Sequence, residues 1–77
     1  MVNTDEVSTA ILKVLPDAEI IVQDLKGTGD HFQVDVVSSA FNGLSKVHQH
    51  QLVYEALKEK LANESIHALA LNTSVPT

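Results

Sequence analysis

The chain has 77 residues and a mass of 8.3 kDa, which leaves room for a single small hydrophobic core. Hydrophobic residues make up 44% and charged residues 19%, as in an ordinary folded domain and unlike a disordered or membrane chain. The formal charge of −5 disfavours a protein that grips nucleic-acid phosphates. The absence of cysteine excludes disulfides, a thiol nucleophile and a self-contained iron–sulfur site for this chain acting alone.

The N-terminal segment lacks the basic stretch and long apolar run of a secretory signal. No segment approaches the ~18 consecutive apolar residues of a membrane span. We therefore expect one cytoplasmic domain over residues 1–77, without membrane association.

The first expected element is a helix over roughly residues 4–15. Asn3, with Glu6 three residues later, resembles a capping box, and Pro16 marks the end of the helix. Apolar residues recur at helical spacing between these signals, at Val7, Ala10, Ile11, Val14 and Leu15.

Two strands are expected next, over residues 18–25 and 31–38, because both segments are rich in Ile, Val or alternating apolar residues. The short loop between them contains Gly27 and Gly29, which favours an antiparallel hairpin with His31 at its exit. A phosphate-binding role for this glycine pair is disfavoured, because such loops lead from a strand into a helix.

A second, longer helix is expected from the N-cap Ser45 to about Asn63. A third strand over residues 66–72 and a flexible polar tail over 73–77 follow. The apolar stripe of the helix predicts its core-facing residues to be Val47, His50, Val53, Tyr54, Leu57 and Leu61.

The resulting order of one helix, two strands, a helix and a strand predicts an α+β fold with a three-stranded mixed sheet packed on helices. A strand, helix and strand in succession normally form a right-handed crossover, so the second and third strands should be parallel. If they are neighbours, His31 and His67 lie toward the same edge of the sheet.

The histidines are the main candidates for chemistry. His48 and His50 point about 200° apart on a helix and cannot chelate one metal together. We expect His50 to be packed and His48 to face solvent or a partner, on the same side as Leu52. His31 and His67 form an incomplete ligand set, which would suit a cluster shared between two proteins. Because no nucleophile, base and orienting acid stand out, we expect no enzymatic activity.

Two motifs resemble the BolA family across essentially the whole chain. They are Phe41-x-Gly43-x-Ser45-x-Val47-x-x-His50-x-x-Val53-Tyr54-x-x-Leu57, and Ile66-His67-Ala68-Leu69 followed by Asn72-Thr73. The resemblance implies an αββαβ fold like the class II KH fold and a heterodimer with a monothiol glutaredoxin. It also implies that His67 and His31 are ligands of a bridging [2Fe–2S] cluster, in iron or redox sensing or cluster trafficking. The glutaredoxin cysteine and glutathione would complete the ligand set. Lys46, His48, His50 and Leu52 are candidate interface residues.

The alternative is a DNA-binding transcriptional regulator of stress response or cell morphology. The helix from Ser45, with the turn before it, loosely resembles a helix-turn-helix reader and carries Lys46, Lys58 and Lys60. Against this, the chain is acidic, and it has Gln49 where many family members carry arginine. A third reading is that the protein binds its partner without metal and the histidines only orient the interface.

Overall fold

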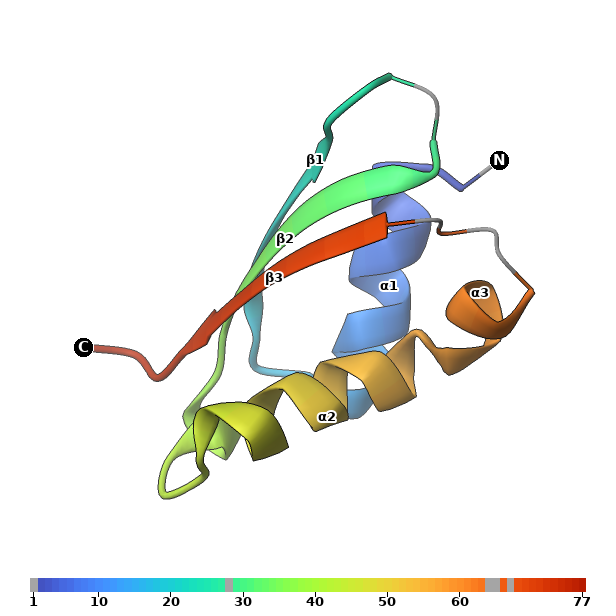
Figure 1. Ribbon diagram of the computed structural model, residues 1–77. Helices are drawn as coiled ribbons and strands as arrows, with labels where there is room; N and C mark the ends of the chain where they lie inside the picture. Colours follow the sequence, from blue (N-terminus) through green and yellow to red (C-terminus); the bar gives the residue numbers. More distant parts are fainter. Residues whose placement is uncertain (1, 28, 64–65, 67) are drawn as a thin grey trace.

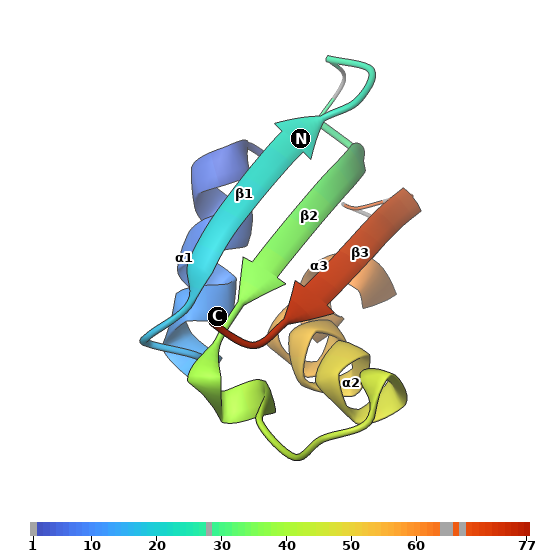
Figure 2. The same cartoon turned by 90° about the vertical axis from the view of Figure 1, so that its left-hand side faces the viewer.

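The computed structural model describes residues 2–27, 29–63, 66 and 68–77. Three strands lie side by side in one sheet, and the helices cover one of its faces (Figures 1 and 2), so the predicted α+β fold is confirmed. The elements, in chain order, are α1 (Thr4–Val14), β1 (Glu19–Asp24), β2 (His31–Val37), the 3-10 helix η1 (Ser39–Phe41), α2 (Lys46–Ala56), α3 (Lys58–Ala62) and β3 (Ala68–Ser74).

Helix α1 begins and ends where the sequence predicts. The side chain of Asn3 accepts a hydrogen bond of 2.8 Å from the backbone N–H of Glu6, which satisfies one of the otherwise unpaired amides of the first turn. The helix ends at Val14, two residues before Pro16. One face of α1 enters the core through Val7 and Ile11, both fully buried.

The sheet has the order β1-β2-β3, with β1 antiparallel and β3 parallel to the central strand. Phe32, Val34 and Val36 of β2 are buried and alternate with partly exposed residues, as the pleat requires. The predicted hairpin and the predicted parallel neighbours are both present.

The predicted single helix over 45–63 is wrong at Leu57. This residue, with φ −105° and ψ 8°, leaves the helical region, so the segment divides into α2 and the short α3, which turns away from the axis of α2 (Figure 1). The Leu57 side chain is buried in the core. The apolar spacing shows no sign of this break, because a helical period continues across it.

The predicted core stripe of the second helix is also partly wrong. Val47 is 65% exposed and Tyr54 is 41% exposed. The buried residues of α2 are Gln49 and Val53, one turn apart, and the line continues to Leu57. A polar residue can occupy the core here because both ends of its amide are hydrogen bonded.

Gln49 joins α2 to β3. Its Nε2 donates to the carbonyl oxygen of Leu44 at 2.9 Å, and its Oε1 accepts from the hydroxyl of Thr73 at 2.8 Å. The bounds predicted for the third strand are wrong at both ends. The strand begins at Ala68 instead of Ile66 and continues to Ser74. Thr73 and Ser74 therefore belong to the strand and not to the predicted tail over 73–77.

We predict that Thr73→Val lowers the free energy of unfolding by about 1–3 kcal/mol, because it leaves the buried Gln49 oxygen without its donor at nearly unchanged volume. Urea denaturation followed by circular dichroism measures this. Ser74→Ala, at an exposed position of the same strand, is the control and should change stability by less than about 0.5 kcal/mol. A Thr73→Val protein as stable as the wild type would contradict the role given to this bond.

Asp17 connects the turn after α1 to the segment that follows β2. Its carboxylate accepts hydrogen bonds from the hydroxyl of Ser38 at 2.8 Å, and from the backbone N–H and hydroxyl of Ser39 at 2.9 and 2.7 Å. These bonds, led by the one from the Ser39 hydroxyl, favour the charged carboxylate and lower the pKa of Asp17 from 3.8 to about 2.

Because the pKa of Asp17 is lower in the folded state, its stabilising contribution is present above the unfolded value of 3.8 and is lost as the pH falls through about 2. We predict that Asp17→Asn weakens the dependence of the urea midpoint on pH between these two values. Ser39→Ala should produce part of the same change. An unaltered pH profile in both variants would contradict the assignment.

Candidate functional site

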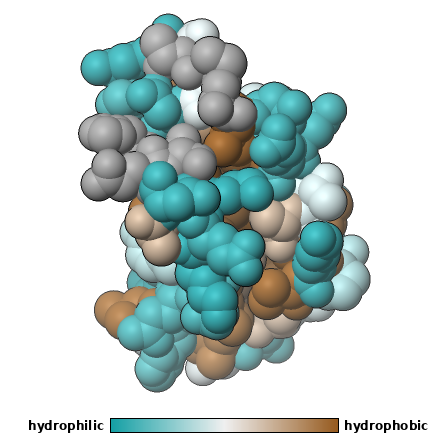
Figure 3. Space-filling view, turned by 90° about the vertical axis from the view of Figure 1, so that its right-hand side faces the viewer, coloured by the Kyte–Doolittle hydropathy of each residue, from teal (hydrophilic) through white to brown (hydrophobic). Residues whose placement is uncertain are grey.

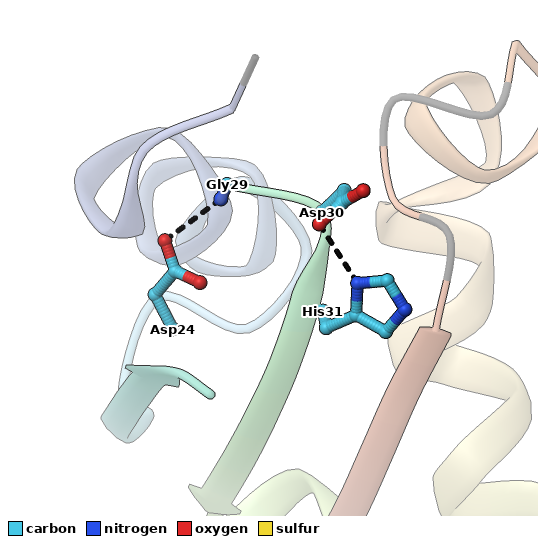
Figure 4. A network of polar contacts seen from close by, with 4 residues as sticks. All are labelled: Asp24, Gly29, Asp30 and His31. Atoms are coloured by element: carbon cyan, nitrogen blue, oxygen red, sulfur yellow. Dashed lines mark hydrogen bonds and ion pairs between the residues drawn. The ribbon is translucent and has the colours of Figure 1, made fainter. Parts of the chain in front are cut away.

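His31 stands at the junction between the hairpin loop and β2. Its ring nitrogen Nδ1 lies 2.7 Å from Oδ1 of Asp30, the residue immediately before it (Figure 4). The side chain of His31 is 26% exposed, so solvent or a partner can reach part of the ring.

The contact between Asp30 and His31 favours a proton on Nδ1 of the ring. An ionised carboxylate has no hydrogen to give, so it accepts and Nδ1–H donates. In the neutral ring, Nε2 then carries the lone pair that a metal ligand needs. Histidines that bind metals usually donate their other N–H to a carboxylate or carbonyl in this way.

The loop that delivers Asp30 is anchored at several points. The carboxylate of Asp24 accepts from the backbone N–H of Gly29 at 2.9 Å (Figure 4). The carbonyl oxygen of Gly29 accepts from the N–H of Val2 at 3.2 Å. Gly29 has a φ of +76°, a conformation that residues with a Cβ rarely adopt, and it is buried. The backbone leading to His31 is therefore tied to both β1 and the N-terminal segment.

Register places the start of β3 beside His31. The two strands pair His31 with Ala68, and the N–H of Ala68 donates to the carbonyl oxygen of Asp30 at 3.1 Å. His67, which precedes Ala68 in the sequence, lies outside the described residues. Its convergence with His31 therefore stays a prediction.

The four candidate interface residues of α2 differ in their surroundings. His48 is exposed, and Leu52 is partly buried against the core. His50 is half-buried and meets Tyr54 edge to face, with ring centroids 6.4 Å apart and planes at 86°. The ammonium of Lys46 donates to the backbone carbonyl of Thr73. His48 thus offers the most open of these side chains.

Lys58 is also engaged within the chain. Its ammonium lies 3.0 Å from the Glu55 carboxylate, and the hydrogen bond and charge of Glu55 raise the pKa of Lys58. On the helix-covered side of the molecule, hydrophobic groups of the described residues are interspersed with hydrophilic ones (Figure 3). Scattered apolar groups of this kind are usual on protein surfaces and do not by themselves mark a docking patch.

Asp30 and Asp24 are site residues that the sequence analysis missed. A carboxylate directly before a histidine at the start of a strand was a usable signal for Asp30. Among residues 2–27, 29–63, 66 and 68–77, no three His, Cys, Asp or Glu side chains gather into a group that could hold a metal ion. None of the helices formed by these residues has the length and hydrophobicity that crossing a membrane requires.

Comparison with known proteins gives concordant results. The family model described as BolA-like protein matches residues 5–77. The uncharacterized protein RP812 of Rickettsia prowazekii is 36% identical over 76 residues, covering 97% of each chain. The DNA-binding transcriptional regulator BolA of Vibrio cholerae is 41% identical over 70 residues, covering 91% of this chain and 64% of the regulator. With longer BolA-like relatives, the match covers as little as 36% of the relative's length.

The fold agrees with the sequence match. The solved structure of BolA1 from Arabidopsis thaliana superposes with a TM-score of 0.85 at 30% identity, covering 99% of this chain and 95% of that one. The family motifs and the αββαβ order of the chain therefore lead to the same assignment. The chain belongs to the BolA family.

Proposed function

We propose that this BolA-family protein forms a heterodimer with a monothiol glutaredoxin and contributes His31 and His67 to a shared [2Fe–2S] cluster. The observation that carries the proposal is the parallel register, which aligns His31 with Ala68, the residue bonded to His67. His31 and Ala68 thus begin neighbouring parallel strands at one edge of the sheet, and His67 is the residue before Ala68 in the sequence. The role would be iron or redox sensing, or cluster trafficking, without catalysis.

The donor chemistry of the described residues fits such a cluster. Imidazole and thiolate ligands occur together on [2Fe–2S] centres, and His31 has the carboxylate-bound Nδ1–H that is typical of metal-binding histidines. The chain has no cysteine, so thiolates would come from the glutaredoxin cysteine and from glutathione. When bound, the cluster would supply one-electron redox chemistry, while this chain orients an imidazole at a partly exposed edge.

We predict that adding the protein to cluster-loaded glutaredoxin changes the visible absorption and circular dichroism spectra, because imidazole replaces a ligand of the glutaredoxin homodimer. His31→Ala and His67→Ala should each remove most of this change. His48→Ala is the comparison variant: His48 is an exposed candidate interface residue on α2 but not a proposed ligand, so its loss should reduce the change less than the loss of either ligand does.

Three outcomes separate the readings of this experiment. Spectra identical to those of the glutaredoxin homodimer would overturn the shared cluster. Equal effects of all three alanine variants would overturn the ligand assignment. If the two proteins bind in calorimetry with no spectral change, the metal-free interface is the correct reading and the histidines only orient it.

A second candidate function is DNA binding, which is favoured by the name of the Vibrio cholerae relative, a DNA-binding transcriptional regulator. The charges of this chain disfavour it. The net charge is −5, Lys46 donates to β3, and Lys58 pairs with Glu55. These lysines would have to leave their partners to reach phosphates.

We predict weak DNA binding without sequence preference that is lost at physiological salt. The reason is that Lys46 and Lys58 are engaged within the chain and do not displace the counterions of the DNA phosphates. A mobility-shift titration across salt concentrations with specific and scrambled duplexes measures this. Lys26→Ala tests a lysine outside the helix, in the exposed part of the hairpin loop. Sequence-specific binding at physiological salt with a steep salt dependence would favour the regulator instead.

A further inference from the structure

We propose that Asp30 is a positioning residue for His31: its carboxylate selects the Nδ1–H tautomer and orients the ring so that Nε2 is the ligating nitrogen. The proposal rests on the shared-cluster function for its consequence, but the geometry that supports it belongs to this chain alone. The two atoms concerned, Asp30 Oδ1 and His31 Nδ1, are 2.7 Å apart.

The backbone is hydrogen bonded at Asp30 and at the residue before it. The carbonyl oxygen of Asp30 accepts from Ala68 N–H at 3.1 Å, so the residue is tied to the entry of β3. On its other side, Gly29 is held by Asp24 and by Val2. Asp30 therefore lies between two hydrogen-bonded points of the backbone, and its carboxylate meets the ring of His31 (Figure 4).

Tautomer selection has a direct chemical consequence. A neutral imidazole exchanges its proton between Nδ1 and Nε2, and only the nitrogen without a proton can bind a metal. A carboxylate beside Nδ1 keeps the proton there and leaves the lone pair on Nε2. The carboxylate also limits rotation of the ring, so the side chain loses less rotational freedom when a metal binds. Loss of such a partner typically weakens metal affinity by about 10–100-fold.

Asp35 provides a matched control on the same strand. Its Oδ1 accepts from the side-chain amides of Gln33 at 3.2 Å and Asn72 at 3.1 Å, and it is four residues beyond His31. Asp35→Asn removes one negative charge, as Asp30→Asn does, but leaves the contact between Asp30 and His31 in place. A general effect of charge would therefore appear in both variants.

The first test uses the protein without cluster. Nitrogen-15 NMR of the imidazole rings at alkaline pH reports the tautomer, and we expect Nδ1–H to dominate for His31. Asp30→Ala should give a mixture of tautomers, and Asp30→Asn should retain part of the preference because its amide oxygen still accepts. Asp35→Asn should match the wild type. A wild-type ring in the Nε2–H form, or an Asp30→Ala ring unchanged from wild type, would overturn the proposal.

The second test uses the cluster-loaded heterodimer with glutaredoxin. We expect Asp30→Ala to speed cluster loss to a chelator by about 10–100-fold, with a smaller effect for Asp30→Asn and none for Asp35→Asn. Backbone amide spectra of each variant check that it is folded. If His31→Ala changes the cluster spectrum but Asp30→Ala and Asp30→Asn retain the cluster as wild type does, positioning is overturned while the proposed function stands. If His31→Ala has no effect on the spectrum, the proposed ligand fails, whereas the tautomer measurement still decides the role of Asp30 in orienting the ring.

Discussion

The parallel pairing of β2 with β3 is the constraint on which the other features depend. It joins segments that are more than thirty residues apart in sequence, and it decides which residues lie at each end of the two strands. Hydrogen bonds hold the register at both ends: Ala68 donates to Asp30 at the entry, and Ser38 donates to Ser74 at the exit. A shift of one residue would move the buried face of β3 to solvent. Thr73 stabilises the same register, because its hydroxyl donates a hydrogen bond to the side chain of Gln49 in the crossover helix.

The same ladder connects the fold to the proposed site. Because parallel strands begin at one edge, the hairpin loop and the entry to β3 are neighbours, and His31 stands at that edge with its ring partly exposed. The hydrogen-bonded loop and the carboxylate of Asp30 favour the Nδ1–H tautomer of His31 and limit rotation of its ring, which are the properties that a metal-binding histidine requires. By contrast, Lys46 and Lys58 make contacts within the chain, which disfavours phosphate binding by these two side chains.

The site was only partly predictable. His31 could be placed at the sheet edge from the hairpin loop and the handedness of the crossover, both of which are general rules. The sequence shows Asp30 directly before His31, but only the structure shows that its carboxylate meets the ring, because Asp30 lies in the loop before β2 and strand alternation does not determine its direction. The partnership of His31 with His67 remains a prediction, since His67 lies outside the described residues.

Local patterns in the sequence by themselves determined the order of the elements, the caps at Asn3 and Ser45, and the alternation along β2, because these depend on periodicity and on hydrogen bonds within a few residues. Only the tertiary structure decided that Gln49 is buried, that the helix breaks at Leu57 and that Thr73 belongs to the third strand. The physical reason is the same in each case. A polar group can enter the core, or a helix can turn, only where residues distant in sequence supply the hydrogen bonds or the apolar surroundings, and no local pattern records those partners.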